Sequence, residues 1–173
     1  GSPLSINSLK QDVGVNHETV STWLELLDRI YFTFRISTYS EKITRSITKE
    51  KKMYLWDWAS VADESIRFEN MVASHLLKSV HLWTDLGYGE YELQYLRNKE
   101  KREVDFLITC DRKPVVAIEC KLNDVSVAES WKYFEKTCEG IPRVQVVRKP
   151  GIDQLSLNGI RTVSAEKFLA GLN

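Results

Sequence analysis

Several common signatures are absent from this sequence of 173 residues. It contains no run of about 18 apolar residues, the length that a helix needs to span a membrane, and no basic and apolar leader of a secreted protein. We therefore expect a cytoplasmic protein with no membrane partner. Its first three residues, Gly1 to Pro3, lack a Met and are typical of a cloning remnant, which predicts further protein upstream.

Cysteines and phosphate-binding motifs are scarce as well. Cys110, Cys120 and Cys138 are odd in number and have no C-x-x-C spacing, which argues against a disulfide framework or a structural zinc site. Neither G-x-x-x-x-G-K-[ST] nor G-x-G-x-x-G occurs, so we expect no nucleotide site.

An excess of charge of either sign is also missing, because 24 Lys and Arg residues balance 24 Asp and Glu residues. This balance excludes a protein that coats nucleic acid through bulk positive charge, but it is compatible with local basic patches. With 43% hydrophobic and 28% charged residues, the composition is that of a folded domain with an ample core.

Residues 1–60 have the pattern of a winged helix. Two short helices are predicted at 5–12 and 16–29, around a turn that contains Gly, and two strands are predicted at 31–37 and 52–56. We treat this segment as one winged-helix-like unit that precedes a second domain.

Two interpretations of this unit are open. A winged helix that reads DNA does so through its second helix, but residues 16–28 contain three acidic and no basic side chains. Residues 41–52 carry a net charge of +3, from five basic and two acidic residues, and Lys42, Arg45 and Lys49 are its candidates for contact with phosphates. We favour a docking or linking module, because the acidic helix would repel phosphates.

Residues 61–173 predict a second domain, a mixed α/β sheet with helices on its faces. The expected elements are a helix at 65–80, strands at 91–97, 103–109 and 114–121, a helix at 125–138, a strand at 143–147, and a short last pair at 160–163 and 166–172.

The strands at 103–109 and 114–121 bring three charged residues together. If they form a hairpin centred on Arg112, Asp105 lies directly opposite Glu119. Directly opposed residues of an antiparallel pair share one face of the sheet, about 5 Å apart at Cβ, and Lys121 shares the face of Glu119 because side chains alternate along a strand.

Two carboxylates this close repel each other unless positive charge lies between them. Lys121 supplies part of that charge. Mg²⁺ or Mn²⁺ would supply more, held by Asp105, Glu119 and the carbonyl of Cys120 with positions left for water. A metal-bound water beside a lysine suits phosphodiester hydrolysis. The alternative is a cluster that neutralises itself on a sheet edge; the apolar strands around it favour a functional reason.

The spacing D-x(13)-E-x-K resembles that of the PD-(D/E)XK nuclease superfamily, with Val104 where the superfamily's name has Pro. More narrowly, four blocks in series after the winged-helix-like start are similar to the domain of unknown function family 4143, found behind an AAA-type ATPase module in many bacterial and archaeal proteins. The blocks are Tyr54-Leu55-Trp56-Asp57, Arg67-Phe68-Glu69-Asn70-Met71-Val72, Glu103-Val104-Asp105-Phe106 and Ile118-Glu119-Cys120-Lys121.

This resemblance implies a restriction-endonuclease-like core with Glu69, Asp105, Glu119 and Lys121 as its catalytic site, and Glu69 as a further metal ligand. It implies a Mg²⁺-dependent nuclease-like domain that hydrolyses DNA and is joined to an upstream AAA-type ATPase. Candidates for contact with DNA phosphates precede Asp105 in the sequence, and they are Arg97, Lys99 and Lys101. Two other functions stay open: a non-catalytic interaction or regulatory module of the ATPase, and a winged-helix DNA-binding module.

Overall fold

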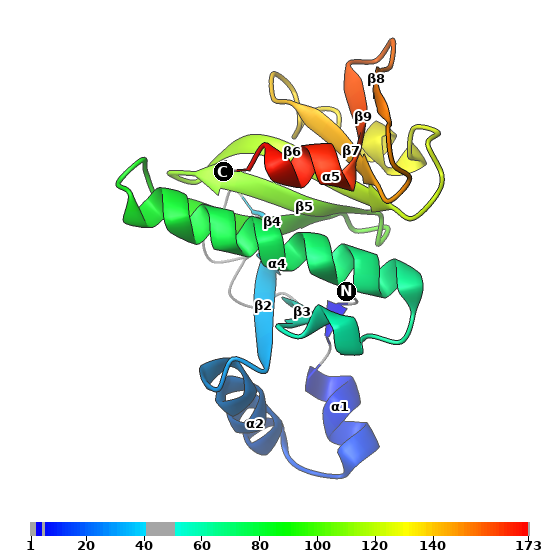
Figure 1. Cartoon of the computed structure of the whole chain (residues 1–173). Coiled ribbons are helices and arrows are strands. Elements are labelled where there is room, and N and C mark those ends of the chain that lie inside the picture. The colour runs from blue at the N-terminus through cyan, green and yellow to red at the C-terminus, as the bar shows by residue number, and fades with distance from the viewer. Residues whose placement is uncertain (1–2, 5, 41–50, 173) are drawn as a thin grey trace.

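The computed structural model describes residues 3–4, 6–40 and 51–172 (Figure 1). The predicted basic segment at 41–52 lies mostly outside the described residues. Its three candidates for phosphate contact, Lys42, Arg45 and Lys49, are therefore not placed.

The N-terminal part consists of short helices and strands. In chain order these are β1 (Pro3–Leu4), α1 (Ile6–Val13), α2 (His17–Arg29), β2 (Thr33–Thr38), β3 (Lys51–Leu55) and the 3-10 helix η1 (Trp58–Ser60). α2 begins where the Asn16 side chain accepts a hydrogen bond from the Thr19 N–H at 2.7 Å, which satisfies one of the free donors of its first turn.

The second part contains one long helix and six strands. In chain order its elements are α4 (Glu64–Asp85), β4 (Tyr91–Arg97), β5 (Glu103–Cys110), β6 (Lys113–Lys121), the 3-10 helix η2 (Glu129–Tyr133), β7 (Arg143–Val147), β8 (Asp153–Leu155), β9 (Ile160–Ser164) and α5 (Ala165–Ala170). Asp63 caps α4, because its side chain accepts a hydrogen bond from the Ile66 N–H at 2.9 Å. None of the helices among the described residues is long and apolar enough to cross a bilayer.

All strands of the described residues belong to one sheet, in the order β1-β3-β2-β4-β5-β6-β7-β9-β8. β4, β5 and β6 pair antiparallel in succession, whereas β6, β7 and β9 are parallel neighbours. β2 pairs in parallel with β4 through Ser37 and Thr38, so the β2–β3 ladder continues the main sheet. The predicted mixed α/β sheet with flanking helices is confirmed.

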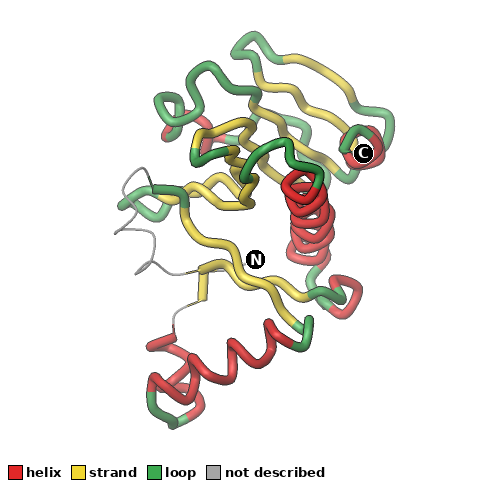
Figure 2. The backbone as a smooth tube through the Cα atoms, turned by 90° about the vertical axis from the view of Figure 1, so that its left-hand side faces the viewer, coloured by secondary structure: helices red, strands yellow, loops and turns green. Residues whose placement is uncertain are grey.

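The long helix α4 covers one face of this sheet (Figures 1 and 2). The core between them is built from aromatic and aliphatic side chains, among them Phe34, Tyr54, Phe68, Val72, Leu76, Tyr95, Phe106 and Ile118. A smaller cluster contains side chains that alternate with these along β5 and β6, so it lies on the opposite face; it includes Leu107, Ala117, Trp131, Phe134 and Cys138. Both faces of the central strands are therefore buried.

The predicted helix at 125–138 is wrong. Only residues 129–133 form a helical turn, η2, and residues 122–128 before it have no regular secondary structure. The reason is Gln145 on β7, whose side-chain amide accepts from the Ala128 N–H at 2.9 Å and donates to the Ser126 carbonyl at 2.7 Å, which holds this backbone away from helical bonding. The apolar residues Trp131, Phe134 and Cys138 have helical spacing, but they anchor an irregular segment to the sheet.

Candidate functional site

The predicted register of the β5–β6 hairpin is confirmed in its inner part, where Phe106 pairs with Ile118 and Ile108 with Val116. The turn differs from the prediction. It consists of Asp111 and Arg112, both with positive φ, and Cys110 pairs with Lys113. An irregularity in β6 after Pro114 then restores the register that a turn centred on Arg112 would give.

The two strands separate where the predicted acidic pair begins. The last pair of the β5–β6 ladder is Phe106 with Ile118, and beyond it β5 continues along β4 while β6 continues along β7. Asp105 and Glu119 therefore stand at a fork rather than as a ladder pair. The Cys120 N–H donates to Oδ2 of Asp105 at 2.9 Å, so a side-chain carboxylate replaces the missing strand partner.

A bulge in β5 turns Asp105 towards α4. Gln94 pairs with Leu107 and Leu96 with Val104, so two residues of β5, Asp105 and Phe106, oppose the single Tyr95 of β4. A bulge of this kind locally breaks the alternation of side chains and re-aims one of them. Asp105 thereby reaches the face that carries the larger core.

A buried lysine lies among the carboxylates on this face. Nζ of Lys52, on β3, lies 3.3 Å from Oδ1 of Asp105, 3.4 Å from Oε1 of Glu69 and 3.2 Å from Oε2 of Glu103. Lys52 is only 1% exposed. Burial alone lowers the pKa of this ammonium group, but the charges of Asp105, Glu69 and Glu103 outweigh burial and raise the pKa above its ordinary value.

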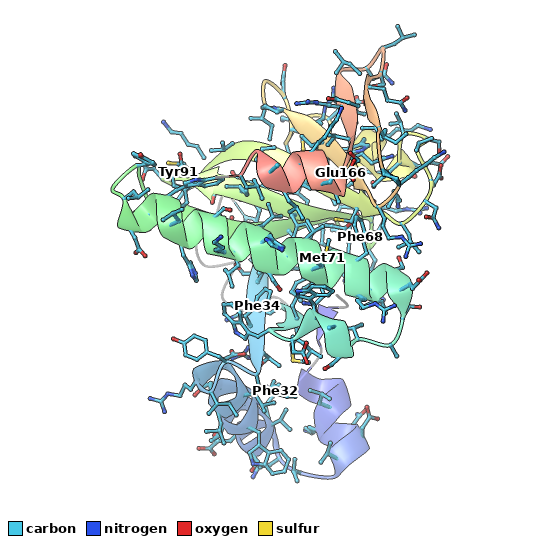
Figure 3. The ribbon with its side chains drawn as sticks, viewed as in Figure 1. Phe32, Phe34, Phe68, Met71, Tyr91 and Glu166 are labelled. Atoms are coloured by element: carbon cyan, nitrogen blue, oxygen red, sulfur yellow. The ribbon has the colours of Figure 1, made fainter. Side chains whose placement is uncertain are left out.

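Residues next to Glu69 on α4 hold the end of β3, the strand that carries Lys52, against this helix. Phe68 and Met71, labelled in Figure 3, flank Glu69 and Asn70 on α4. The Asn70 side chain accepts from the Leu55 N–H at 2.9 Å and donates to the Leu55 carbonyl at 2.7 Å. Asn70 thus binds the end of β3 as a neighbouring strand would, which holds that strand against the helix that carries Glu69.

Tyr54 adds a second link between β3 and α4. Its hydroxyl donates to Oε1 of Glu69 at 2.8 Å, and its ring packs against those of Phe34 and Phe106. Burial, followed by the charges of Glu69 and Asp105, raises the pKa of Tyr54 well above its ordinary value. The phenol therefore stays protonated and serves as a donor to the carboxylate.

Glu119 and Lys121 form the other half of the site. They alternate with Ile118 and Cys120, which pack in the larger core, so they lie on the opposite face of β6, and the prediction that they share a face with Asp105 is wrong. Oε1 of Glu119 lies 3.0 Å from Nζ of Lys121, whose side chain is partly exposed, whereas Glu119 itself is 5% exposed. Oε2 of Glu119 is buried and has no hydrogen-bond partner among the described residues. Burial, and then the charge of Asp105, raises the pKa of Glu119 to about 7, although Lys121 opposes the increase.

The donor chemistry at the fork fits Mg²⁺ or Mn²⁺ in part. Asp105 and Glu119 offer hard carboxylate oxygens, one of them without a partner, and Mg²⁺ is commonly held by one or two carboxylates with water and substrate phosphates completing its shell. In the arrangement found, no three acidic, histidine or cysteine side chains among the described residues converge to hold a metal ion. Glu69, the predicted further ligand, contacts Lys52 and Tyr54 instead.

A family model described as Domain of unknown function (DUF4143) matches residues 66–168, more than half of the chain. The chain belongs to this family. The predicted resemblance to family 4143 is therefore confirmed, and the matched range contains Glu69, Asp105, Glu119 and Lys121. A second model, described as Domain of unknown function (DUF8612), matches residues 1–63, which include Lys52. Comparisons with curated proteins and with solved structures give no match.

The cations predicted to contact DNA lie in different settings within this DUF4143 chain. Arg97, at the end of β4, forms an ion pair with Glu103, and Glu103 in turn contacts Lys52. Lys99 and Lys101 are exposed in the turn between β4 and β5. Arg97 is thus part of the acidic cluster through its ion pair with Glu103, whereas Lys99 and Lys101, a few residues later in the sequence, are exposed to solvent.

Lys52 and Glu103 are site residues that the sequence reasoning missed. The charge pattern places Lys52 in the basic segment 41–52, although Lys52 and Tyr54 are two residues apart on a strand and therefore share its buried face. A lysine on the core face of a strand requires buried carboxylate partners. That pattern was the available signal, but it does not say which acids would be the partners.

Proposed function

We propose that this chain carries a divalent-metal-dependent, nuclease-like domain of the PD-(D/E)XK type that hydrolyses DNA phosphodiesters. The observation that carries the proposal is the fork itself. There, a buried glutamate with one unpartnered oxygen lies at the end of the ladder beside Asp105, and a partly exposed lysine is paired with it. Lys121 compensates this buried carboxylate only in part, because the pKa of Glu119 stays raised to about 7, and a bound cation would complete the compensation.

The roles follow from the surroundings of each group. Asp105 and Glu119 would hold the cation, with the Cys120 carbonyl as the third protein oxygen. Mg²⁺ or Mn²⁺ bound there would supply a water of lowered pKa and neutralise charge on the phosphodiester. Burial lowers the pKa of Lys121, but the charge and hydrogen bond of Glu119 together with the charge of Asp105 outweigh burial and raise this pKa, which keeps the ammonium group charged. Its ammonium group is suited to stabilise charge on the phosphate.

Substrate contacts would come from the turn between β4 and β5, which leads directly into the strand that carries Asp105. Lys99 and Lys101 are exposed there and can approach a phosphate without breaking an internal ion pair. The helices and strands of residues 1–60 would serve as a winged-helix-like linking unit between this domain and an AAA-type ATPase upstream.

One observation favours a second function, a non-catalytic interaction or regulatory module of that ATPase. Lys52 neutralises part of the acidic cluster through three carboxylate contacts, so Glu69, Glu103 and Asp105 are stable together without a metal ion. In that case the acidic residues would hold β3 and α4 to the sheet, and their arrangement would be structural.

Incubation with single-stranded and double-stranded DNA in Mn²⁺ tests the nuclease proposal. We expect cleavage by the wild-type protein and a loss of at least about 100-fold in Lys121→Ala, the range typical for removal of one charge-stabilising group. Lys113→Ala, which removes an exposed lysine at the start of the same strand, is the matched control and should retain activity. Equal cleavage by the wild type and Lys121→Ala would show a contaminant and refute the proposal.

A further inference from the structure

Lys52 reaches the acidic cluster from a different part of the chain than the carboxylates it contacts. Lys52 lies on β3, within the range matched by the DUF8612 model, whereas Glu69, Glu103 and Asp105 lie within the range matched by the DUF4143 model. β3 also pairs with β2 and β1, so the lysine is carried by the N-terminal strands.

This lysine occupies the side of Asp105 that faces the rest of the cluster. Oδ2 of Asp105 accepts from the Cys120 N–H, and Oδ1 lies 3.3 Å from Nζ of Lys52, so both oxygens are engaged. Glu69 is engaged in the same way by Lys52 and by the Tyr54 hydroxyl. A divalent cation that uses Asp105 would therefore meet an ammonium group already in place.

Because the site is buried, the ammonium group of Lys52 and a divalent cation would repel each other strongly. Lys52 is almost fully buried, and its ammonium group also lies 5.3 Å from the centre of the Tyr95 ring, which stabilises a cation in that position. Charges that are shielded from water repel each other far more than exposed charges do. Two cations would not share these carboxylates without a large penalty.

We propose that Lys52 is a resident counter-cation that competes with the divalent metal for Asp105, so that this buried charge on β3 sets how tightly the site binds metal. This inference rests on the proposed metal-dependent function. It concerns the metal affinity of that site: an internal positive charge beside Asp105 weakens the binding of metal, and removal of that charge strengthens it.

β3 is fixed in the position that brings Lys52 to Asp105. Asn70 holds the end of β3 through two hydrogen bonds to Leu55, and Ile36 of β2 pairs with Lys52 itself. These contacts keep the ammonium group of Lys52 beside Asp105, where it opposes the binding of a metal ion.

The test is the dissociation constant for Mn²⁺, measured by calorimetric titration of the whole chain. Lys52→Met keeps the length and apolar stem of the side chain but removes the charge, and we expect it to bind Mn²⁺ roughly tenfold or more tightly than the wild type. Lys51→Met removes the same charge from the neighbouring exposed residue of β3, and it should bind as the wild type does.

A second variant tests the same proposal if Lys52→Met does not fold. In Lys52→Met/Glu103→Gln one carboxylate is removed together with the lysine, which lowers the charge imbalance in the buried cluster. Glu103→Gln alone is its control, and the double variant should bind Mn²⁺ more tightly than that single variant.

The outcomes separate this inference from the proposed function. Mn²⁺ binding of equal strength in the wild type, Lys52→Met and the double variant overturns the competition but leaves a metal-dependent nuclease intact. No Mn²⁺ binding in any folded variant overturns both. Tighter binding in Lys52→Met without cleavage of DNA by any variant supports the competition and refutes the nuclease function.

Discussion

Asp105 accepts a hydrogen bond from the Cys120 backbone N–H at 2.9 Å at the point where β5 and β6 separate. A carboxylate in this position does two things at once. It satisfies a backbone donor that has lost its partner strand, and it places a negative charge beside Glu119 and Lys52. The separation of β5 and β6 therefore explains both the hydrogen bond that Asp105 accepts and the position of its charge near Glu119 and Lys52.

Substitution of Asp105 should separate these two roles. Asp105→Ala leaves the Cys120 N–H without an acceptor, and we expect the free energy of unfolding to fall by about 1–3 kcal/mol. Asp105→Asn retains an oxygen acceptor and removes the charge, and Lys52 still has Glu69 and Glu103 as partners, so the loss should be smaller. Urea denaturation of the three proteins measures the difference; equal losses would show that the hydrogen bond contributes nothing.

Glu119 should make the fold less stable as the pH rises. Its pKa in the folded protein is raised to about 7 from an ordinary value of 4.5. Between these two values the folded state holds a proton that the unfolded state has released, so the free energy of unfolding decreases across this window. We expect a contribution of up to about 3 kcal/mol, fully developed above about pH 7.

The measurement is the pH dependence of stability in metal-free buffer for the wild type and Glu119→Gln. Because other titrating groups are common to both proteins, the difference between their curves isolates Glu119. Glu119→Gln should gain stability relative to the wild type from pH 4.5 to pH 7. A constant difference over this range would mean that the buried carboxyl group titrates normally.

Removal of the Tyr54 hydroxyl should weaken the link between β3 and α4. Tyr54→Phe keeps the ring contacts and deletes the hydrogen bond to Glu69, and we expect a loss of about 1–2 kcal/mol, because that bond is to a charged acceptor. Tyr88→Phe, at an exposed tyrosine beyond α4, is the control and should change stability little. Thermal or urea unfolding measures both, and identical stabilities would refute the contribution of this bond.

Asn70 should contribute more to stability than an ordinary polar residue on a helix. Asn70→Ala removes both hydrogen bonds to Leu55 and leaves a buried N–H and carbonyl without partners, which predicts a loss of about 2–3 kcal/mol. Asn98→Ala, which deletes one hydrogen bond in an exposed turn, should cost far less. If the two variants were equally stable, Asn70 would not be what holds β3 in place.

The sheet and the register of its hairpin could be predicted from the sequence, because apolar runs and alternation report which side chains are buried. The register of Phe106 against Ile118 agrees with a turn centred on Arg112 because the irregularity after Pro114 compensates for the different turn. The fork beyond that pair could not be predicted, since it depends on which neighbouring strands β5 and β6 follow, a matter of long-range pairing.

The contact between Lys52 and Asp105 could not be predicted either, for a different reason. Lys52 is separated from Asp105 by 53 residues, and nothing in either local pattern connects them. The bulge that turns Asp105 towards α4 depends on pairing with Tyr95 and is equally invisible in the sequence of β5. The failed helix at 125–138 has a related cause, because Gln145 fixes that backbone from a distant strand.

The measurement that tests the central claim most directly is the rate of cleavage of a labelled DNA oligonucleotide as Mn²⁺ is increased. It compares the wild type with Asp105→Asn, the variant that keeps an acceptor for the Cys120 N–H. We predict a rate that rises with Mn²⁺ in the wild type and falls by at least about 100-fold in Asp105→Asn while the variant stays folded. Cleavage that is independent of Mn²⁺, or equal in the two proteins, would contradict the assignment of this fork as a metal-dependent nuclease site.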